Sequence, residues 1–100
     1  MIKHTIIWNL KDTLTDEEKQ NVKLSAKQNL EALVGKIDGL IDLKVVIDFL
    51  PTSNGEMMLD STFESFEALK AYAIHPAHQA AANEFVRPYT ASRSCVDFEI

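Results

Sequence analysis

The segment that decides the fold reads LIDLKVVIDFL (40–50), PTSNG (51–55) and EMMLDSTF (56–63). The last part alternates apolar and polar residues around Met57 and Leu59, and it predicts a strand. Asn54-Gly55 predicts a turn before it, because this pair readily adopts positive φ. The first part also predicts a strand, Leu40 to Leu50, with five apolar residues on one face: Ile41, Leu43, Val45, Ile47 and Phe49. The middle of the chain is therefore expected to form two antiparallel strands.

On the N-terminal side of these strands, the sequence predicts a strand and then a helix. Residues Ile2 to Leu10 are rich in β-forming residues and carry apolar groups on both faces, so this strand is expected to be covered on two sides. Thr15-Asp-Glu-Glu18 is a capping-box pattern, and apolar residues recur at helical spacing behind it as far as Val34. Gly35 is expected to end the helix.

On the C-terminal side, the sequence predicts an interrupted helix and a last strand. A short helix is expected from about Ser65. Pro76 then restarts the helix, because the amide that proline lacks would have no partner at the first helical position. The second helix continues to Val86 before Pro88 ends it. Ser92 to Ile100 alternates again and is expected to complete the sheet.

The order of elements is therefore β-α-β-β-α-β, the ferredoxin-like α+β pattern with an antiparallel four-stranded sheet, in a single domain covering residues 1–100. With the helices on one face, apolar residues on the other face would meet water, at a cost of roughly 25 cal/mol per Å². A second copy laid sheet against sheet removes that cost. We therefore expect a symmetric homodimer that closes an α/β barrel.

Composition excludes several classes of function. The 100 residues carry a formal net charge of −5, and no run of Lys and Arg offers a surface for phosphates, so no nucleic-acid partner is expected. No apolar run approaches membrane-spanning length, and the first residues lack the core of a signal peptide. Cys95 is the only cysteine, which excludes an intrachain disulfide and fits a reducing compartment. A cytoplasmic protein without a membrane partner is expected.

The stretch Ala71-Tyr-Ala-Ile-His-Pro-Ala-His78 concentrates the groups that are suited to chemistry. Histidine titrates nearest to neutral pH and serves in proton transfer and in metal binding. His75 is expected to cap the helix that Pro76 begins. His78 then lies in the first turn, where the helix dipole lowers the imidazole pKa and keeps it neutral. A metal site at His75 and His78 is not expected, because no third ligand stands nearby in the sequence.

Four stretches carry a resemblance to a known family: Lys3-His4 with the alternating residues behind it, Thr62-Phe-Glu-Ser65, Tyr72 to His78, and Val96-Asp97-Phe98. The resemblance covers nearly the whole chain. The chain resembles the stress-responsive A/B-barrel domain family, dimeric α/β barrels that include plant polyketide cyclases. The resemblance implies the same fold and the same dimer.

The resemblance also implies a pocket between sheet and helices with a catalytic pair, Tyr72 and His78. In that role His78 accepts a proton from a carbon next to a carbonyl, and Tyr72 donates a hydrogen bond to the developing enolate oxygen. The cyclases line the pocket with aromatic residues where this chain has Val22 and Ala26, so the substrate is expected to differ. The ligand-binding residues expected on this basis are His4, Ile6, Trp8, Val22, Ala26, Leu59 and His75.

Three classes of function follow. The first is a binding protein that holds a small hydrophobic or carbonyl-bearing ligand in the cleft between sheet and helices. The second is a cofactor-independent cyclase or lyase that uses Tyr72 and His78 as its acid/base pair. The third is a protective or structural protein, in which His78 makes a structural hydrogen bond and His4 is a satisfied core histidine. No cofactor and no metal is expected in any of them.

Overall fold

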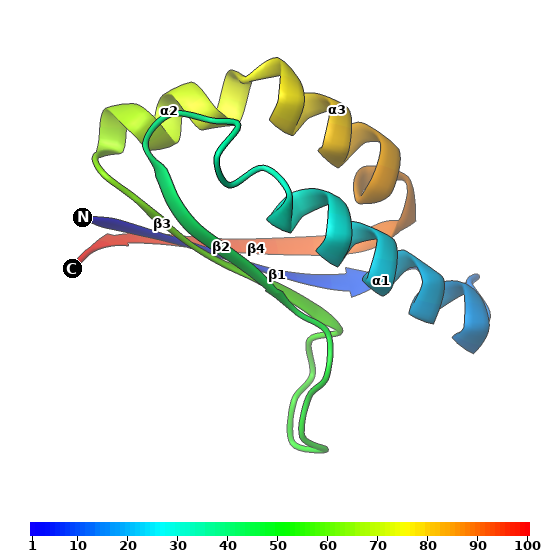
Figure 1. The fold of residues 1–100 in the computed structure, drawn as a ribbon. Coiled ribbons are helices and arrows are strands. Elements are labelled where there is room, and N and C mark those ends of the chain that lie inside the picture. The colour runs from blue at the N-terminus through cyan, green and yellow to red at the C-terminus, as the bar shows by residue number, and fades with distance from the viewer.

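The computed structural model describes residues 1–100 as one antiparallel sheet with all its helices on one side (Figure 1). The strands lie in the order β2-β3-β1-β4. This arrangement confirms the predicted ferredoxin-like α+β fold. The elements are β1 (Ile2–Leu10), α1 (Asp16–Glu31), β2 (Leu40–Val46), β3 (Met57–Phe63), α2 (Phe66–Ile74), α3 (Pro76–Phe85), the 3₁₀ helix η1 (Arg87–Tyr89) and β4 (Thr90–Glu99).

Strand β1 is central and carries the inward-facing residues that matter most for the site. It pairs with β3 on one side and with β4 on the other, so that His4 lies opposite both Ser61 and Asp97. Residues directly opposite in antiparallel strands point to the same face of the sheet. Alternation along β1 buries His4, Ile6 and Trp8 beneath the helices.

The helix starts follow the sequence signals closely. Thr15 and Glu18 form the capping box: Glu18 N–H donates to the Thr15 hydroxyl at 3.1 Å, and Thr15 N–H donates to the Glu18 carboxylate at 2.9 Å. At the start of α2 the Ser65 hydroxyl accepts from Ala68 N–H at 3.1 Å. These caps satisfy amides that would otherwise lack partners, and they fix where each helix begins.

The end of α1 differs from the prediction. The helix stops at Glu31, before Gly35, and the chain continues through hydrogen-bonded turns. These turns bury Leu33 and Ile37 in the core, and Gly35 adopts a left-handed φ of 89° within them. Gly35 therefore serves the turn and not the helix terminus.

Strand β2 is shorter than predicted, and one of its residues faces the other way. It ends at Val46, and its register shifts between Leu40 and Asp42. This irregularity places Leu40 and Leu43 on the buried face and leaves Ile41 41% exposed. The loop that follows extends away from the sheet on the side opposite the helices (Figure 1).

The turn predicted at Asn54-Gly55 in that loop also differs from the expectation. Gly55 does not have a positive φ, and the turn closes earlier, where Ser53 N–H donates to the Leu50 carbonyl at 3.0 Å. A β-carbon on Gly55 would lie 2.6 Å from Cγ2 of Ile7. Gly55 is therefore needed for the close approach of the loop to β1.

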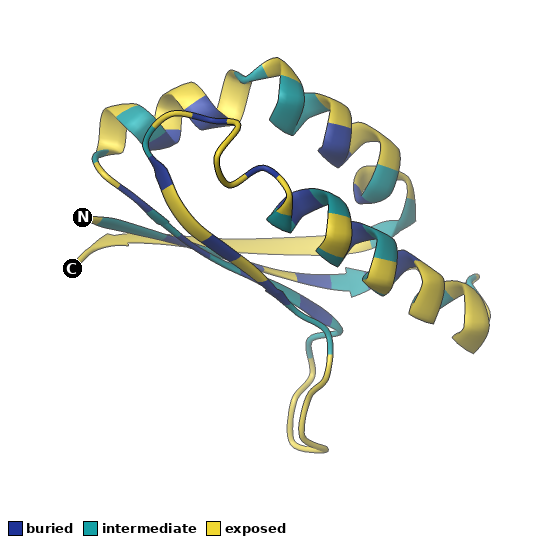
Figure 2. Ribbon diagram, in the orientation of Figure 1, coloured by how far each residue is buried: buried dark blue, intermediate teal, exposed yellow.

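The two faces of the sheet are unlike each other. The core lies between the sheet and the helices, and β4 is exposed along almost its whole length (Figure 2). On the open face, Ile7, Val96 and Phe98 are 43%, 58% and 49% exposed. The expected apolar surface on this face is therefore present. None of the helices combines the length and the apolar character needed to cross a membrane.

Candidate functional site

A cavity of about 160 Å³ lies between β1, the two C-terminal helices and the start of β4. Strand β1 contributes His4, Ile6 and Trp8 to its wall, and α2 and α3 contribute Tyr72 and His78. Five of the residues predicted from the sequence therefore come together around one space.

Tyr72 forms the inner wall of the cavity. Its ring is only 2% exposed, and it packs 4.9 Å from the Phe63 ring and 4.2 Å from the His78 ring, measured between centroids. Burial raises the pKa of the Tyr72 phenol far above its usual value. The hydroxyl therefore keeps its proton at neutral pH and is a hydrogen-bond donor.

His78 owes its position to the break between α2 and α3. Pro76 begins α3 as predicted, and His75 caps it, its Nδ1 accepting from Ala77 N–H at 3.0 Å. His78 follows in the first turn, where its Nδ1 lies 3.2 Å from the Ala73 carbonyl. Because a carbonyl only accepts, Nδ1 carries the proton, and Nε2 of the neutral ring keeps a free lone pair.

The acidity of His78 is shifted in the direction expected from the sequence, with a different main cause. Burial lowers the pKa of the His78 imidazole below 6.5. The hydrogen bond to Ala73 partly opposes this effect, and the charges of Arg87, His4 and Arg93 lower the pKa further. Sequence reasoning attributed the shift to the helix dipole. In either case the neutral form of His78 is favoured near pH 7.

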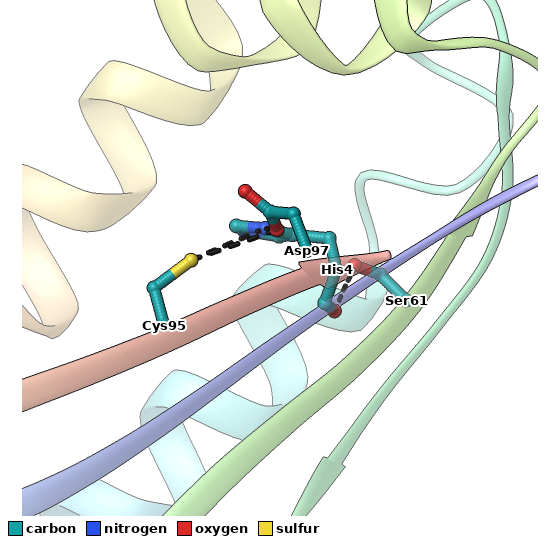
Figure 3. A network of polar contacts seen from close by, with 4 residues as sticks. All are labelled: His4, Ser61, Cys95 and Asp97. Carbon is teal, nitrogen blue, oxygen red and sulfur yellow. Dashed lines mark hydrogen bonds and ion pairs between the residues drawn. The ribbon is translucent and has the colours of Figure 1, made fainter. Parts of the chain in front are cut away.

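His4 belongs to a polar cluster that joins β1 to β4. Its Nδ1 lies 2.5 Å from Oδ1 of Asp97 and 3.7 Å from Sγ of Cys95, and its backbone carbonyl accepts from the Ser61 hydroxyl at 2.8 Å (Figure 3). Cys95 is exposed, and the pKa of its thiol is raised by partial desolvation and by the neighbouring Asp97 carboxylate. Sequence reasoning did not connect Cys95 or Asp97 with His4, because the strand register that joins them is a tertiary feature.

Four of the predicted ligand-binding residues lie away from this cavity. Val22 and Ala26 are on α1, which packs over β2 and beside α3, and Leu59 is buried in the core. Val22 also lines a wider groove between α1 and α3, which contains no histidine or cysteine. His75 is used by the helix cap.

Two cationic residues of the cavity wall were not predicted. Arg87 in η1 and Arg93 in β4 both line it. Arg93 reaches the cavity through the pairing of β4 with β1, whereas Arg87 follows α3 directly and donates hydrogen bonds to Gln79 and Asn83 of that helix. The site therefore combines a proton acceptor, a hydrogen-bond donor and two positive charges around one small space.

The comparisons with known proteins cover nearly the whole chain. The family model described as the stress responsive A/B barrel domain matches residues 2–100. No curated protein is similar enough in sequence to count as a relative. Among solved structures, a dimeric protein of unknown function with a ferredoxin-like fold from Bacteroides fragilis is 34% identical, with a TM-score of 0.91 over 99% of this chain and 95% of that one.

Two more distant structures share the fold. One is a protein of the same domain family from Mesorhizobium loti, 20% identical, with a TM-score of 0.74 over 99% of this chain and 95% of that one. The other is the hydroxynitrile lyase of Passiflora edulis, 17% identical, with a TM-score of 0.73 over 99% of this chain and 92% of that one.

Proposed function

The chain therefore belongs to the stress responsive A/B barrel domain family, and we propose that it binds a small carbonyl-bearing molecule in the cavity beside Tyr72 and His78. The pairing of these two rings, 4.2 Å apart on the cavity wall, is the observation that carries the proposal. A protonated phenol donates a hydrogen bond to a carbonyl oxygen, and the neutral imidazole beside it accepts one from the ligand.

The size of the cavity limits the ligand. A volume of about 160 Å³ is close to that of the dry cavities of ~150 Å³ that hold a benzene molecule. Sites for drug-sized molecules are larger, roughly 300–1,000 Å³. We therefore expect a ligand with about one ring and not an extended polyketide chain.

Arg87 and Arg93 extend the proposal to the charge of the ligand. Both line the cavity, and no carboxylate does. Guanidinium groups bind carboxylates strongly and in defined geometry. A small oxo acid, with a carbonyl for Tyr72 and a carboxylate for the arginines, fits this arrangement best.

A second candidate is catalysis by the same pair. Nε2 of His78 takes a proton from the carbon next to the ligand carbonyl, and the electron pair left behind forms an enolate whose oxygen accepts a hydrogen bond from Tyr72. The lowered pKa of His78 favours this candidate, because it keeps the base unprotonated near neutral pH. The lyase of Passiflora edulis has the same fold, which makes a cofactor-independent lyase a reasonable class to assay.

We also infer that two copies associate through the open face of the sheet. Ile7, Val96 and Phe98 are exposed there, and burying them removes the cost of their contact with water. The Bacteroides fragilis protein, 34% identical, is dimeric.

The test is a titration of the ¹⁵N-labelled protein with phenylglyoxylate, acetophenone and benzoate, followed by NMR. The first carries both the carbonyl and the carboxylate, and the other two carry one each. We expect phenylglyoxylate to bind best and to shift the amide signals around Tyr72 and His78. If none of the three compounds changes the amide chemical shifts around Tyr72 and His78, the proposal is refuted.

A matched pair of variants makes the test specific. Tyr72→Phe removes the hydrogen bond to the ligand carbonyl, worth about 0.5–1.5 kcal/mol, so phenylglyoxylate should bind roughly threefold to tenfold more weakly. His78→Asn removes the cavity-lining ring that packs 4.2 Å from the Tyr72 ring, and it should weaken binding as well. His75→Asn is the control, because asparagine also caps helices and His75 does not line the cavity. Equal weakening in His75→Asn and His78→Asn would contradict the assignment of His78.

A further inference from the structure

A second group of reactive side chains lies at the junction of β1 and β4, apart from the Tyr72–His78 pair. The imidazole of His4, the thiol of Cys95 and the carboxylate of Asp97 point toward one another on the helix side of the sheet (Figure 3). Their ligand atoms all lie within 4.8 Å of one another. We propose that these three residues form a binding site for a divalent cation of the zinc class.

The distances between the three ligand atoms agree with tetrahedral coordination. Metal bonds of about 2.3 Å to sulfur and about 2.0–2.1 Å to nitrogen or oxygen place the sulfur roughly 3.5 Å from each of the other two ligands. Sγ of Cys95 is 3.7 Å from His4 Nδ1 and 3.6 Å from Asp97 Oδ1. The two distances from the Cys95 sulfur to the other ligand atoms therefore already have the length that a tetrahedral site requires.

The third distance, between the His4 nitrogen and the Asp97 oxygen, must increase slightly. His4 Nδ1 and Asp97 Oδ1 are 2.5 Å apart, while ligands of one tetrahedral ion would be separated by roughly 3.3 Å. The Asp97 side chain is 40% exposed and is free to make this adjustment. The proton between these two groups moves to Nε2 of His4, and the Cys95 thiol releases its proton to solvent.

The strand register holds the three ligands in place. His4 is opposite Asp97 and Ile6 is opposite Cys95, so both β4 ligands face the same side as the imidazole. The His4 ring is itself confined, since it is 7% exposed and makes edge contacts with Phe63 and Tyr72 at 6.2 Å between centroids. The least mobile ligand therefore comes from the central strand.

The chemistry of the donors selects the metal. Magnesium and calcium require six or more oxygen ligands, whereas imidazole and thiolate favour zinc and related ions. Three protein ligands leave a fourth position for water, which the exposure of Cys95 allows. The thiolate and the carboxylate balance the charge of a dication. Arg93, the preceding residue on this face of β4, adds a positive charge and opposes very tight binding.

The bound ion would tie the exposed edge strand to the centre of the sheet. His4 also lines the ligand cavity, but the metal titration is read without the ligand and the ligand titration without the metal, so either proposal can fail alone. The test uses the full chain, stripped of metal and without an affinity tag, titrated with Co²⁺ and then with Zn²⁺. We expect one Co²⁺ per chain, with a thiolate-to-cobalt charge-transfer band that Zn²⁺ abolishes, and a higher melting temperature with Zn²⁺.

Variants at the exposed ligands separate this site from casual surface binding. Cys95→Ser should remove the charge-transfer band. Asp97→Asn should weaken Co²⁺ binding at least tenfold, because even the partners of metal ligands are worth about 10–100-fold. Glu99→Gln, which removes the same charge from the same strand opposite Ile2, should change nothing. Absence of the band at saturating Co²⁺, or unchanged affinity in both ligand variants, would overturn the proposal.

Discussion

The two faces of the sheet use the same alternating strands for different purposes. On the helix-covered face, the apolar residues of β1 and β3 are buried, and the few polar groups among them, such as His4 and Ser61, are hydrogen-bonded. On the open face, apolar residues of β1 and β4 remain in contact with water. The covered face can therefore position chemical groups within a single chain, whereas the open face needs a second surface.

Burial and function divide along the period-two pattern of each strand. A residue and its sequence neighbour differ in face, and hence in role: His4 contributes to the cavity, while Thr5 belongs to the open face. Substitutions on the covered face should therefore affect folding and ligand binding. Substitutions on the open face should affect association.

The largest expected effect is on the free energy of unfolding, when phenylalanines on the two opposite faces are each replaced by alanine. Phe63→Ala removes a fully buried ring that packs on Tyr72, and it should lower the free energy of unfolding by about 3–5 kcal/mol. Phe98→Ala, at a ring that is half exposed on the open face, should cost far less in the isolated chain. Urea unfolding of both variants, each at low and high protein concentration, measures the difference. Equal losses at low concentration would contradict the contrast between the faces.

The next largest effect is expected on dimerisation, when a charged residue is introduced on the open face. Val96→Asp places a carboxylate among the exposed apolar residues of the proposed contact, where burying an unpaired charge costs several kcal/mol. We expect the dimer to weaken at least tenfold, with little change in the fold. Sedimentation velocity across a range of concentrations is the measurement. A wild-type protein that is monomeric at every concentration, or a variant that dimerises normally, would exclude this interface.

A smaller effect on stability is expected when one of two serines is replaced by alanine. Ser65→Ala removes the cap of the helix that carries Tyr72, and it should cost about 1 kcal/mol. Ser94→Ala, on the exposed part of β4, has no such bond to lose and should be nearly neutral. Thermal unfolding of the two variants, followed by circular dichroism, compares them. A stability loss at Ser94 that matches the loss at Ser65 would show that the cap is not the cause.

Much of the fold could be predicted because its signals are local. The capping box at Thr15, the cap at Ser65 and the proline that restarts a helix at Pro76 each act within one turn of the chain. The errors occurred where longer-range contacts decide. The bulge at Ile41 depends on pairing with β3, and Gly55 is required by its contact with Ile7.

The residues of the candidate site also fall into those that the sequence could predict and those that depend on long-range contacts. Tyr72 and His78 stand in one short motif and were assigned to the site from the family resemblance, and alternation puts His4, Ile6 and Trp8 on one face of β1. Arg93 and the Cys95–Asp97 pair reach the site only because β4 folds back beside β1, which no local pattern encodes. Val22 and Ala26 were assigned to the site from a resemblance, whereas their own helix lies over β2.

The pH titration of His78 by NMR tests the proposed site most directly. Burial and the nearby cations should hold the pKa of its imidazole below 6.5. Because the unfolded chain takes up this proton at higher pH than the folded chain, the contribution of His78 to stability is complete above pH 6.5 and is lost as the pH falls through the folded pKa. A pKa below 6.5 that shifts when phenylglyoxylate binds is the predicted result. A pKa at or above 6.5, unaffected by the ligand, would contradict a neutral His78 at the ligand site.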